Sequence, residues 1–97
     1  MPTYEATPRF TTDHHRLTPE QRQRFRRIVT RAFVPDLRAG QFRNGLRIKR
    51  VRCAPGVYEL TWDRNGRATW SYGKARIQGK RHIVWHRIGT HDILSGP

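Results

Sequence analysis

The sequence predicts an α+β fold, in which an N-terminal strand and a helix region pack on one face of a roughly four-stranded antiparallel sheet. Two patterns predict it. Apolar residues between positions 25 and 33 recur every three or four residues, the period of a helix with one buried face. From Leu46 onward they recur every second residue, the period of strands. The 97 residues suit one domain, so residues 1–97 are expected to share one core, with 1–9 as an extended arm or edge strand.

The helix is expected to begin after Thr18. Thr18 suits the N-cap, Pro19 suits the first helical position, and Gln21 completes a capping box. Pro35 should end or kink the helix, and one further turn could then stop at Gly40. The apolar stripe consists of Phe25, Ile28, Val29, Ala32 and Phe33.

The alternating segments predict four strands, at residues 46–51, 57–62, 67–72 and 82–88. A loop of residues 64–66 between the second and third strands, with Gly66 left-handed, would place Trp62 opposite Ala68. This register sorts the two faces cleanly. The face under the helix would hold Tyr58, Leu60, Trp62, Ala68, Trp70 and Tyr72, together with Leu46 and Ile48. The open face would hold Glu59, Thr61, Arg67, Thr69 and Ser71, together with Arg47 and Lys49.

The charge balance points to an acidic partner. The 20 Lys and Arg residues exceed the 7 Asp and Glu residues by 13, and 17 of the 20 cations are arginine. A guanidinium binds phosphate with two parallel hydrogen bonds and stacks on bases, so the bias favours nucleic acid.

Cys53 is the only cysteine, which excludes an internal disulfide and a Cys-based zinc site and suits a reducing cytoplasm. No stretch approaches the roughly 20 apolar residues of a membrane span, and no secretory segment is recognisable. His82 and His86 would lie roughly 13 Å apart on a strand, too far to share a metal. We therefore expect a cytoplasmic protein with no membrane partner, no metal and no cofactor.

A cationic patch is expected on the open face of the sheet. Arg47, Lys49, Arg67 and Arg87 could together clamp a phosphate and stabilise the extra charge of a phosphoryl-transfer transition state. Glu59 is the acid on this face, and it could act as a general base or form a cross-strand salt bridge that positions Arg67.

His91 lies just beyond the last predicted strand, in the segment Gly89-Thr90-His91-Asp92. A near-neutral pKa makes histidine the usual residue for proton transfer. From its position alone, His91 could be a general acid or base, or a histidine that caps the strand end.

Three segments give the sequence a family likeness: residues 45–51 (GLRIKRV), 57–60 (VYEL) and 87–94 (RIGTHDIL). In this order they resemble the RelE/ParE superfamily of bacterial type II toxins, over about Phe10 to Leu94. The ending resembles the YafQ-type branch, and the second and third strands resemble the HigB-type branch. The chain departs from the family at Glu59, where RelE-type toxins have an arginine, and at Leu94, which is commonly Phe in the YafQ-type element.

The resemblance implies a ribosome-dependent endoribonuclease, in which the 2′-OH of the mRNA attacks the adjacent phosphate without a metal. His91 would match the catalytic histidine, Arg67 would stabilise the phosphorane, and Lys49 would assist on the strand of basic contacts. The expected RNA-binding residues are Arg47, Arg50, Arg87, Thr69 and Ser71. The expected partners are the ribosome, with its mRNA and rRNA, and an acidic antitoxin. Arg22, Arg26 and Arg27 on the helix are candidate contacts for either.

Two other functions are compatible with the same fold. One is a ParE-like poison of a topoisomerase, in which His91 would be a structural turn residue. The other is a basic RNA-binding module without catalytic activity, which would show salt-dependent binding and no toxicity.

Overall fold

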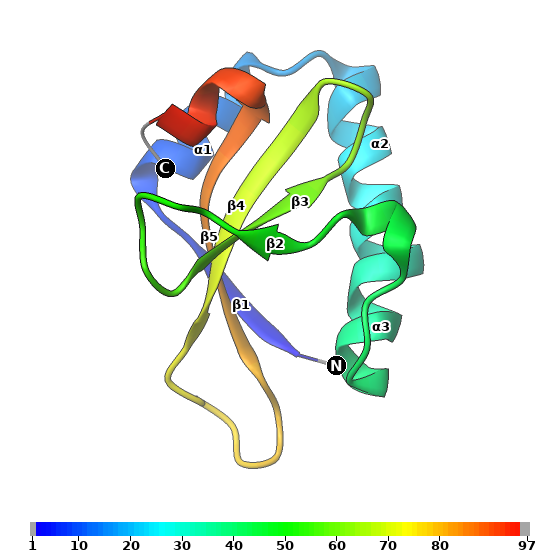
Figure 1. Cartoon of the computed structure of the whole chain (residues 1–97), viewed down its shortest axis with the longest axis vertical. Coiled ribbons are helices and arrows are strands. Elements are labelled where there is room, and N and C mark those ends of the chain that lie inside the picture. The colour runs from blue at the N-terminus through cyan, green and yellow to red at the C-terminus, as the bar shows by residue number, and fades with distance from the viewer. Residues whose placement is uncertain (1, 96–97) are drawn as a thin grey trace.

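The computed structural model describes residues 2–95, which form a five-stranded mixed sheet flanked by helices (Figure 1). The strand order is β1-β5-β4-β3-β2, with β1 parallel to β5 and every other pair antiparallel. The strands are β1 (Thr3–Ala6), β2 (Lys49–Arg50), β3 (Val57–Thr61), β4 (Gly66–Gly73) and β5 (His82–Thr90). The helical elements are α1 (Pro8–Arg16), α2 (Pro19–Ile28), the π turn η1 (Val29–Phe33), α3 (Val34–Ala39), and the 3-10 turns η2 (Asn44–Leu46) and η3 (His91–Ser95). The α+β class is confirmed.

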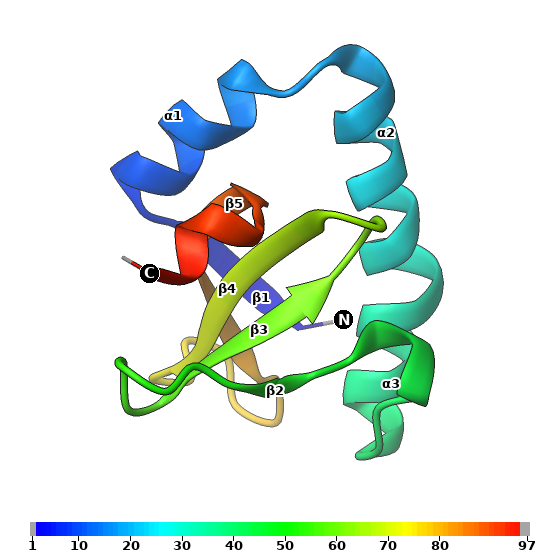
Figure 2. The ribbon, with the colours of Figure 1, turned by 45° about the horizontal axis from the view of Figure 1, so that its top comes forward.

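The N-terminal arm is shorter than the range 1–9 predicted. Residues 3–6 form the edge strand that the prediction allowed, and it joins the sheet beside β5 in parallel, so the sheet is mixed and not wholly antiparallel. Helix α1 already begins at Pro8, because Thr7 caps it: the Thr7 hydroxyl accepts a hydrogen bond from the Phe10 N–H at 3.1 Å. Figure 2 shows that α1 lies across one end of the sheet and is separate from the continuous helix that α2 and α3 form.

The main helix runs almost as predicted. Thr18 and Gln21 form the capping box, with hydrogen bonds of 3.1 and 2.8 Å. Pro35 has no N–H and its ring would clash with the carbonyl four residues earlier. The helix accommodates it by widening into the π turn η1 and continues as α3, rather than stopping. Gly40 then ends α3 with a φ of 81°.

The β3–β4 hairpin has a three-residue loop, as predicted, but the loop is residues 63–65 rather than 64–66. The Trp62 N–H donates to the Gly66 carbonyl at 3.1 Å, and Leu60 pairs with Ala68. Gly66 is therefore a strand residue and not the left-handed residue of the loop. Both strands keep their faces, because the observed pairing differs from the predicted one by two residues.

The main core lies between the sheet and the helices. Phe25 and Phe33 on the helices meet Trp62, Trp70 and Trp85 on the sheet. Tyr72, which we expected under the helix, is 42% exposed instead, because it lies near the end of β4. The residues inward as predicted include Leu46, Leu60, Trp62, Ala68 and Trp70.

The opposite face of the sheet is partly covered, which the sequence did not predict. The turn η3 packs against β4 and β5 (Figure 1). The Ile93 side chain of η3 lies 3.1 Å from where a Cβ of Gly89 would be. On this face Thr69 is fully buried and Glu59 is only 5% exposed, although both were expected on an open surface.

Candidate functional site

His91 lies where β5 ends and η3 begins, as the sequence predicted. Thr90 is the last residue of β5 and pairs with Gly66, the first residue of β4. His91 therefore follows directly after the pair that closes this end of the sheet, and its side chain is exposed. Gly89 allows this arrangement, since a Cβ there would come within 3.1 Å of Ile93, which anchors η3.

Arg67 lies at the same end of the sheet as His91. It is opposite Gly89 on β5 and Thr61 on β3. One terminal nitrogen of its guanidinium lies 3.0 Å from the Gly66 carbonyl and 3.3 Å from the carbonyls of residues 63 and 64. The hairpin turn therefore fixes the cation beside the strand end from which His91 emerges.

Lys49 lies on the same face of the sheet as Arg67, two residues farther along the strand direction. It pairs with Glu59 across β2 and β3, and its Nζ lies 3.5 Å from the carboxylate. Standard strand spacing puts the Cα atoms of Lys49 and Arg67 roughly 12 Å apart, within the combined reach of two long side chains. Glu59 was predicted to bridge to Arg67, but it bridges to Lys49, and its neighbour on β4 is Thr69. Its burial and this ion pair favour the salt-bridge interpretation over a general base.

Arg87 was expected to contact RNA, and the structure ties its guanidinium to helix α1. Its Nε and one terminal nitrogen donate to the Asp13 carboxylate at 2.6 and 3.2 Å, and the Ile88 N–H donates to the same carboxylate at 3.2 Å. Burial raises the pKa of Asp13, but the hydrogen bonds from Arg87 and Ile88 outweigh it and leave that pKa below its ordinary value. The same bond raises the pKa of Arg87.

The other predicted RNA-binding residues are dispersed. Arg47 is not in a strand, because it has a left-handed φ of 48° after η2. Arg50 pairs with Tyr58, which packs on the main core, so Arg50 lies on the face opposite Lys49. Thr69 is fully buried and has no surface with which to contact RNA, so we leave it out of the proposed site. Ser71 remains on the predicted face.

Sequence reasoning missed His86 as the partner of Ser71. A β-bulge between Thr69 and Trp70 in the pairing with β5 disrupts the register there, and the His86 Nε2 lies 2.8 Å from the Ser71 hydroxyl. Burial lowers the pKa of His86, which favours the neutral ring. Strand alternation could not reveal this pair, because it assumes an unbroken register.

Within residues 2–95, no cluster of three or more His, Cys, Asp or Glu side chains could hold a metal ion. Over the same range, no helix is long and apolar enough to cross a membrane. The candidate site consists of His91, Arg67 and Lys49, with Ser71 farther along the same face of β4.

The architecture defines the class of fold. Helices and an edge strand precede four antiparallel strands, the last of which is followed by His91, and this α+β arrangement is compatible with the RelE-like fold that the sequence resemblance implied. Among solved structures, the crystal structure of the E. coli DinJ–YafQ complex contains a similar chain, with a TM-score of 0.66. The match covers 99% of this chain and 100% of that chain at 13% sequence identity, so the likeness is one of fold. No protein-family model and no curated protein matches the sequence.

Proposed function

We propose that this protein is the toxin of a type II toxin–antitoxin system and that it cleaves mRNA on the ribosome without a metal. One observation supports the proposal above the others. In a RelE-like fold, the pairing of Gly66 with Thr90 brings His91 and Arg67 to the same end of the sheet. A proton-transfer residue beside a fixed guanidinium is the minimum needed for cleavage through the RNA's own 2′-OH.

In the proposed reaction, the 2′-oxygen bonds to the adjacent phosphorus while the bond to the 5′-oxygen breaks. His91 acts as general acid or base: as the acid, it gives its proton to the departing 5′-oxygen while water takes the proton of the 2′-OH, and as the base it takes that proton while water protonates the 5′-oxygen. Arg67 stabilises the additional negative charge of the phosphorane, and Lys49 supplies a second cation from β2. The products are a 2′,3′-cyclic phosphate and a free 5′-hydroxyl. Arg47 and Ser71 would contact the flanking RNA.

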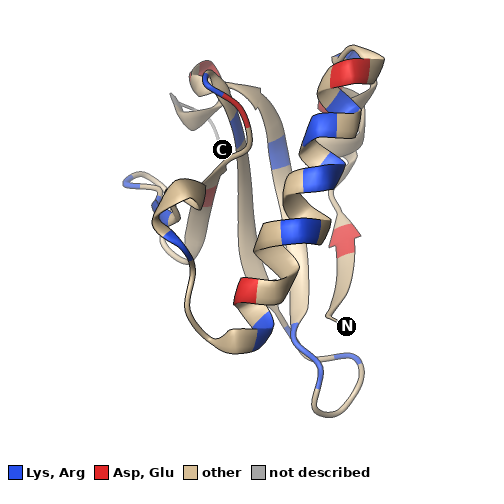
Figure 3. Cartoon of the chain, turned by 90° about the vertical axis from the view of Figure 1, so that its right-hand side faces the viewer, with Lys and Arg blue, Asp and Glu red and all other residues tan. Residues whose placement is uncertain are grey.

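The proposed partners follow from charge and from the structural neighbour. That neighbour was solved as a complex of two proteins, which supports an antitoxin partner here. A net charge of +13 favours an acidic antitoxin and, in its absence, ribosomal RNA. Exposed arginines follow one another along α2 and η1, as Figure 3 shows, and Arg26, Arg27 and Arg31 offer contacts for either partner. Both partners place the protein in the cytoplasm.

The test is induced expression in a bacterial host, followed by measurement of protein synthesis and mapping of mRNA 5′ ends. We expect wild-type protein to stop translation and to produce new 5′ ends within codons. His91→Ala and Arg67→Ala should each slow cleavage, by about 100-fold or more for the histidine. His15→Ala, which removes an exposed histidine of α1, is the matched control and should remain fully active.

Three outcomes would contradict the proposal. Undiminished cleavage in both variants would remove His91 and Arg67 from the mechanism. Growth arrest with DNA damage and uncut mRNA would indicate a ParE-like topoisomerase poison. Absence of arrest, with salt-dependent RNA binding in vitro, would indicate a binding module.

A further inference from the structure

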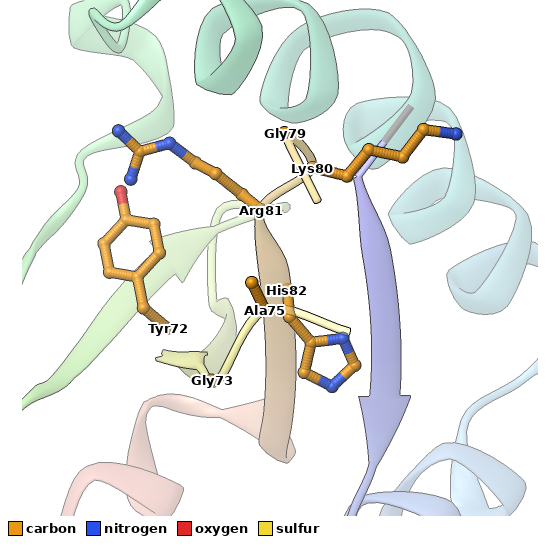
Figure 4. Close-up of a pocket in the computed structure, with 7 residues that line it drawn as sticks. All are labelled: Tyr72, Gly73, Ala75, Gly79, Lys80, Arg81 and His82. Carbon is orange, nitrogen blue, oxygen red and sulfur yellow. The ribbon is translucent and has the colours of Figure 1, made fainter. Parts of the chain in front are cut away.

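A second basic surface lies at the end of the sheet farthest from His91. Residues 74–81 connect β4 to β5 and include Lys74, Arg76, Lys80 and Arg81 but no acidic residue. At the base of this loop, a cavity of about 310 Å³ is lined by residues that include Tyr72, Lys80 and Arg81 (Figure 4). A basic loop beside a partly exposed aromatic ring is the combination that binds unpaired nucleotides.

The guanidinium of Arg81 is held against an aromatic ring. Its central carbon lies 5.0 Å from the centroid of Tyr72. Tyr72 is held in turn, because its ring makes edge contacts with Trp70 at 5.2 Å and with Tyr58 at 6.0 Å. The 42% exposed Tyr72 ring and the exposed Arg81 side chain therefore form a preoriented stacking surface at the edge of the main core.

The base of the loop is anchored to the edge strand β1. The Arg81 carbonyl accepts the Thr3 N–H at 2.9 Å, and the buried His82 ring bridges the Thr3 hydroxyl at 2.7 Å and the Glu5 carboxylate at 2.8 Å. Glu5 also pairs with Arg76 at 3.0 Å. Over residues 2–95, no ion pair engages Lys74, Lys80 or Arg81. This anchoring fixes the backbone at the base of the loop, while the side chains of Lys74, Lys80 and Arg81 are exposed to solvent.

This surface is separate from the candidate catalytic site. Gly66 and Gly73 lie at opposite ends of β4, and the seven residue steps from one to the other span roughly 23 Å along the strand. Tyr72 also lies on the helix side of the sheet, whereas Lys49 and Arg67 lie on the other side. One nucleotide cannot reach both places.

We propose that Tyr72, Arg81, Lys80 and Lys74 form a second binding site for single-stranded RNA. An unpaired base stacks on the Arg81 guanidinium, which Tyr72 supports from beneath, and the adjoining phosphates contact Lys80 and Lys74. A guanidinium stacked on a tyrosine presents a flat face, which suits a base better than the carboxylates of an acidic peptide. The site binds RNA whether or not His91 cleaves it, so it goes beyond the proposed catalytic activity.

The test measures fluorescence anisotropy of the full-length protein with two labelled 2′-O-methyl oligonucleotides, which cannot be cleaved through a 2′-OH. One probe has all its bases, and the other has the same phosphates with abasic central positions. Wild-type protein should bind the complete probe at least about fivefold more tightly, the lower range of base stacking on an aromatic group. Arg81→Lys and Tyr72→Leu should abolish this preference, while Tyr72→Phe should retain it.

Arg9→Lys is the matched control, because it makes the same replacement at an exposed arginine of α1 and should leave the preference unchanged. Circular dichroism establishes whether each variant is folded. If Tyr72→Leu does not fold, Arg81→Lys still provides the test. Equal affinity of wild-type protein for both probes would overturn the proposal. So would a preference that survives Arg81→Lys, or displacement of the complete probe by polyglutamate at equal charge. A duplex competitor as effective as a single strand would also overturn it.

Discussion

At the scale of single residues, Asp13 has the most consequential contacts of any acid in the chain. Its carboxylate is nearly buried and accepts hydrogen bonds from Arg87 and from the Ile88 N–H. The pairing of β1 with β5 ends at Trp85, so β1 offers no partner to the Ile88 N–H. The Asp13 carboxylate accepts this hydrogen bond instead. Asp13 thus substitutes for the missing strand and joins α1 to the sheet.

Replacing Asp13 should therefore destabilise the whole fold. Asp13→Ala leaves a largely buried guanidinium and a buried N–H without their partner, and we expect it to lower the free energy of unfolding by about 2–3 kcal/mol. Urea denaturation measures this loss. Arg24→Ala is the control, because it removes the more exposed Arg24–Asp63 pair, which should contribute no more than about 1 kcal/mol, and leaves the Asp63 turn intact. Equal losses of unfolding free energy in the two variants would show that burial of the Asp13–Arg87 pair adds nothing to its contribution to stability.

The sequence predicts the positions of site residues better than their partners. His91 lies just beyond the last strand as predicted, because strand periodicity locates the end of that strand to within two residues. The partner of Arg87 was invisible, because Asp13 lies 74 residues away in α1, a helix that the sequence analysis did not locate. The burial of Thr69 and Glu59 was equally invisible, since strand alternation sorts residues by face and does not show what covers a face.

At the scale of elements, the β3–β4 hairpin shows why its predicted register was displaced. Sorting residues by face cannot distinguish two registers that differ by two residues, because side chains alternate with a period of two. The turn decides between them. The Asp63 carboxylate accepts the Arg64 N–H at 2.8 Å and the Gly66 N–H donates to the Asp63 carbonyl at 3.0 Å, which closes the loop one residue earlier than predicted.

The same hairpin explains the need for glycine at position 66. A Cβ there would lie 2.6 Å from the Trp62 ring, which is fixed in turn by an edge contact with Phe25 at 6.2 Å. Gly66→Ala should lower the free energy of unfolding by about 1–3 kcal/mol through overpacking. Gly45→Ala is the control: a Cβ at that position would meet nothing within 4 Å, so the substitution should be neutral or slightly stabilising. Thermal denaturation of both variants makes the comparison, and an unchanged stability of Gly66→Ala would mean that Trp62 moves freely.

At the scale of the whole molecule, the few acids serve structure. At least five of the seven acidic residues form ion pairs with cations, and several of these pairs join elements distant in sequence. Glu5 links β1 to the 74–81 loop, Asp13 links α1 to β5, and Asp63 links the hairpin to α2. Because the acids are used in this way, the remaining cations give the surface a strong positive field suited to a polyanion.

This arrangement predicts a loss of stability in acid. Hydrogen bonds from Arg43, two from its guanidinium and one from its backbone N–H, lower the pKa of Asp36 to about 2 from an ordinary 3.8. A hydrogen bond with His82 lowers the pKa of Glu5 below 4.5. Carboxyls with depressed pKa values bind protons more readily in the unfolded chain, so their stabilisation is complete above about pH 4.5 and disappears as the pH falls toward 2. Urea midpoints measured between pH 7 and 2 should therefore fall mainly below pH 4.5.

The histidines should add a smaller, separate decline. Burial lowers the pKa of His86 and is also the largest cause of the lowered pKa of His14, so both rings favour the neutral form in the fold. Their stabilisation is present above pH 6.5 and is lost as the pH falls through the folded pKa values. His86→Gln should flatten the part of the curve that begins below pH 6.5, whereas Asp36→Asn should flatten it only below about pH 4. If neither substitution altered the curve, general repulsion among the cations would cause the acid sensitivity, and added salt would then remove it.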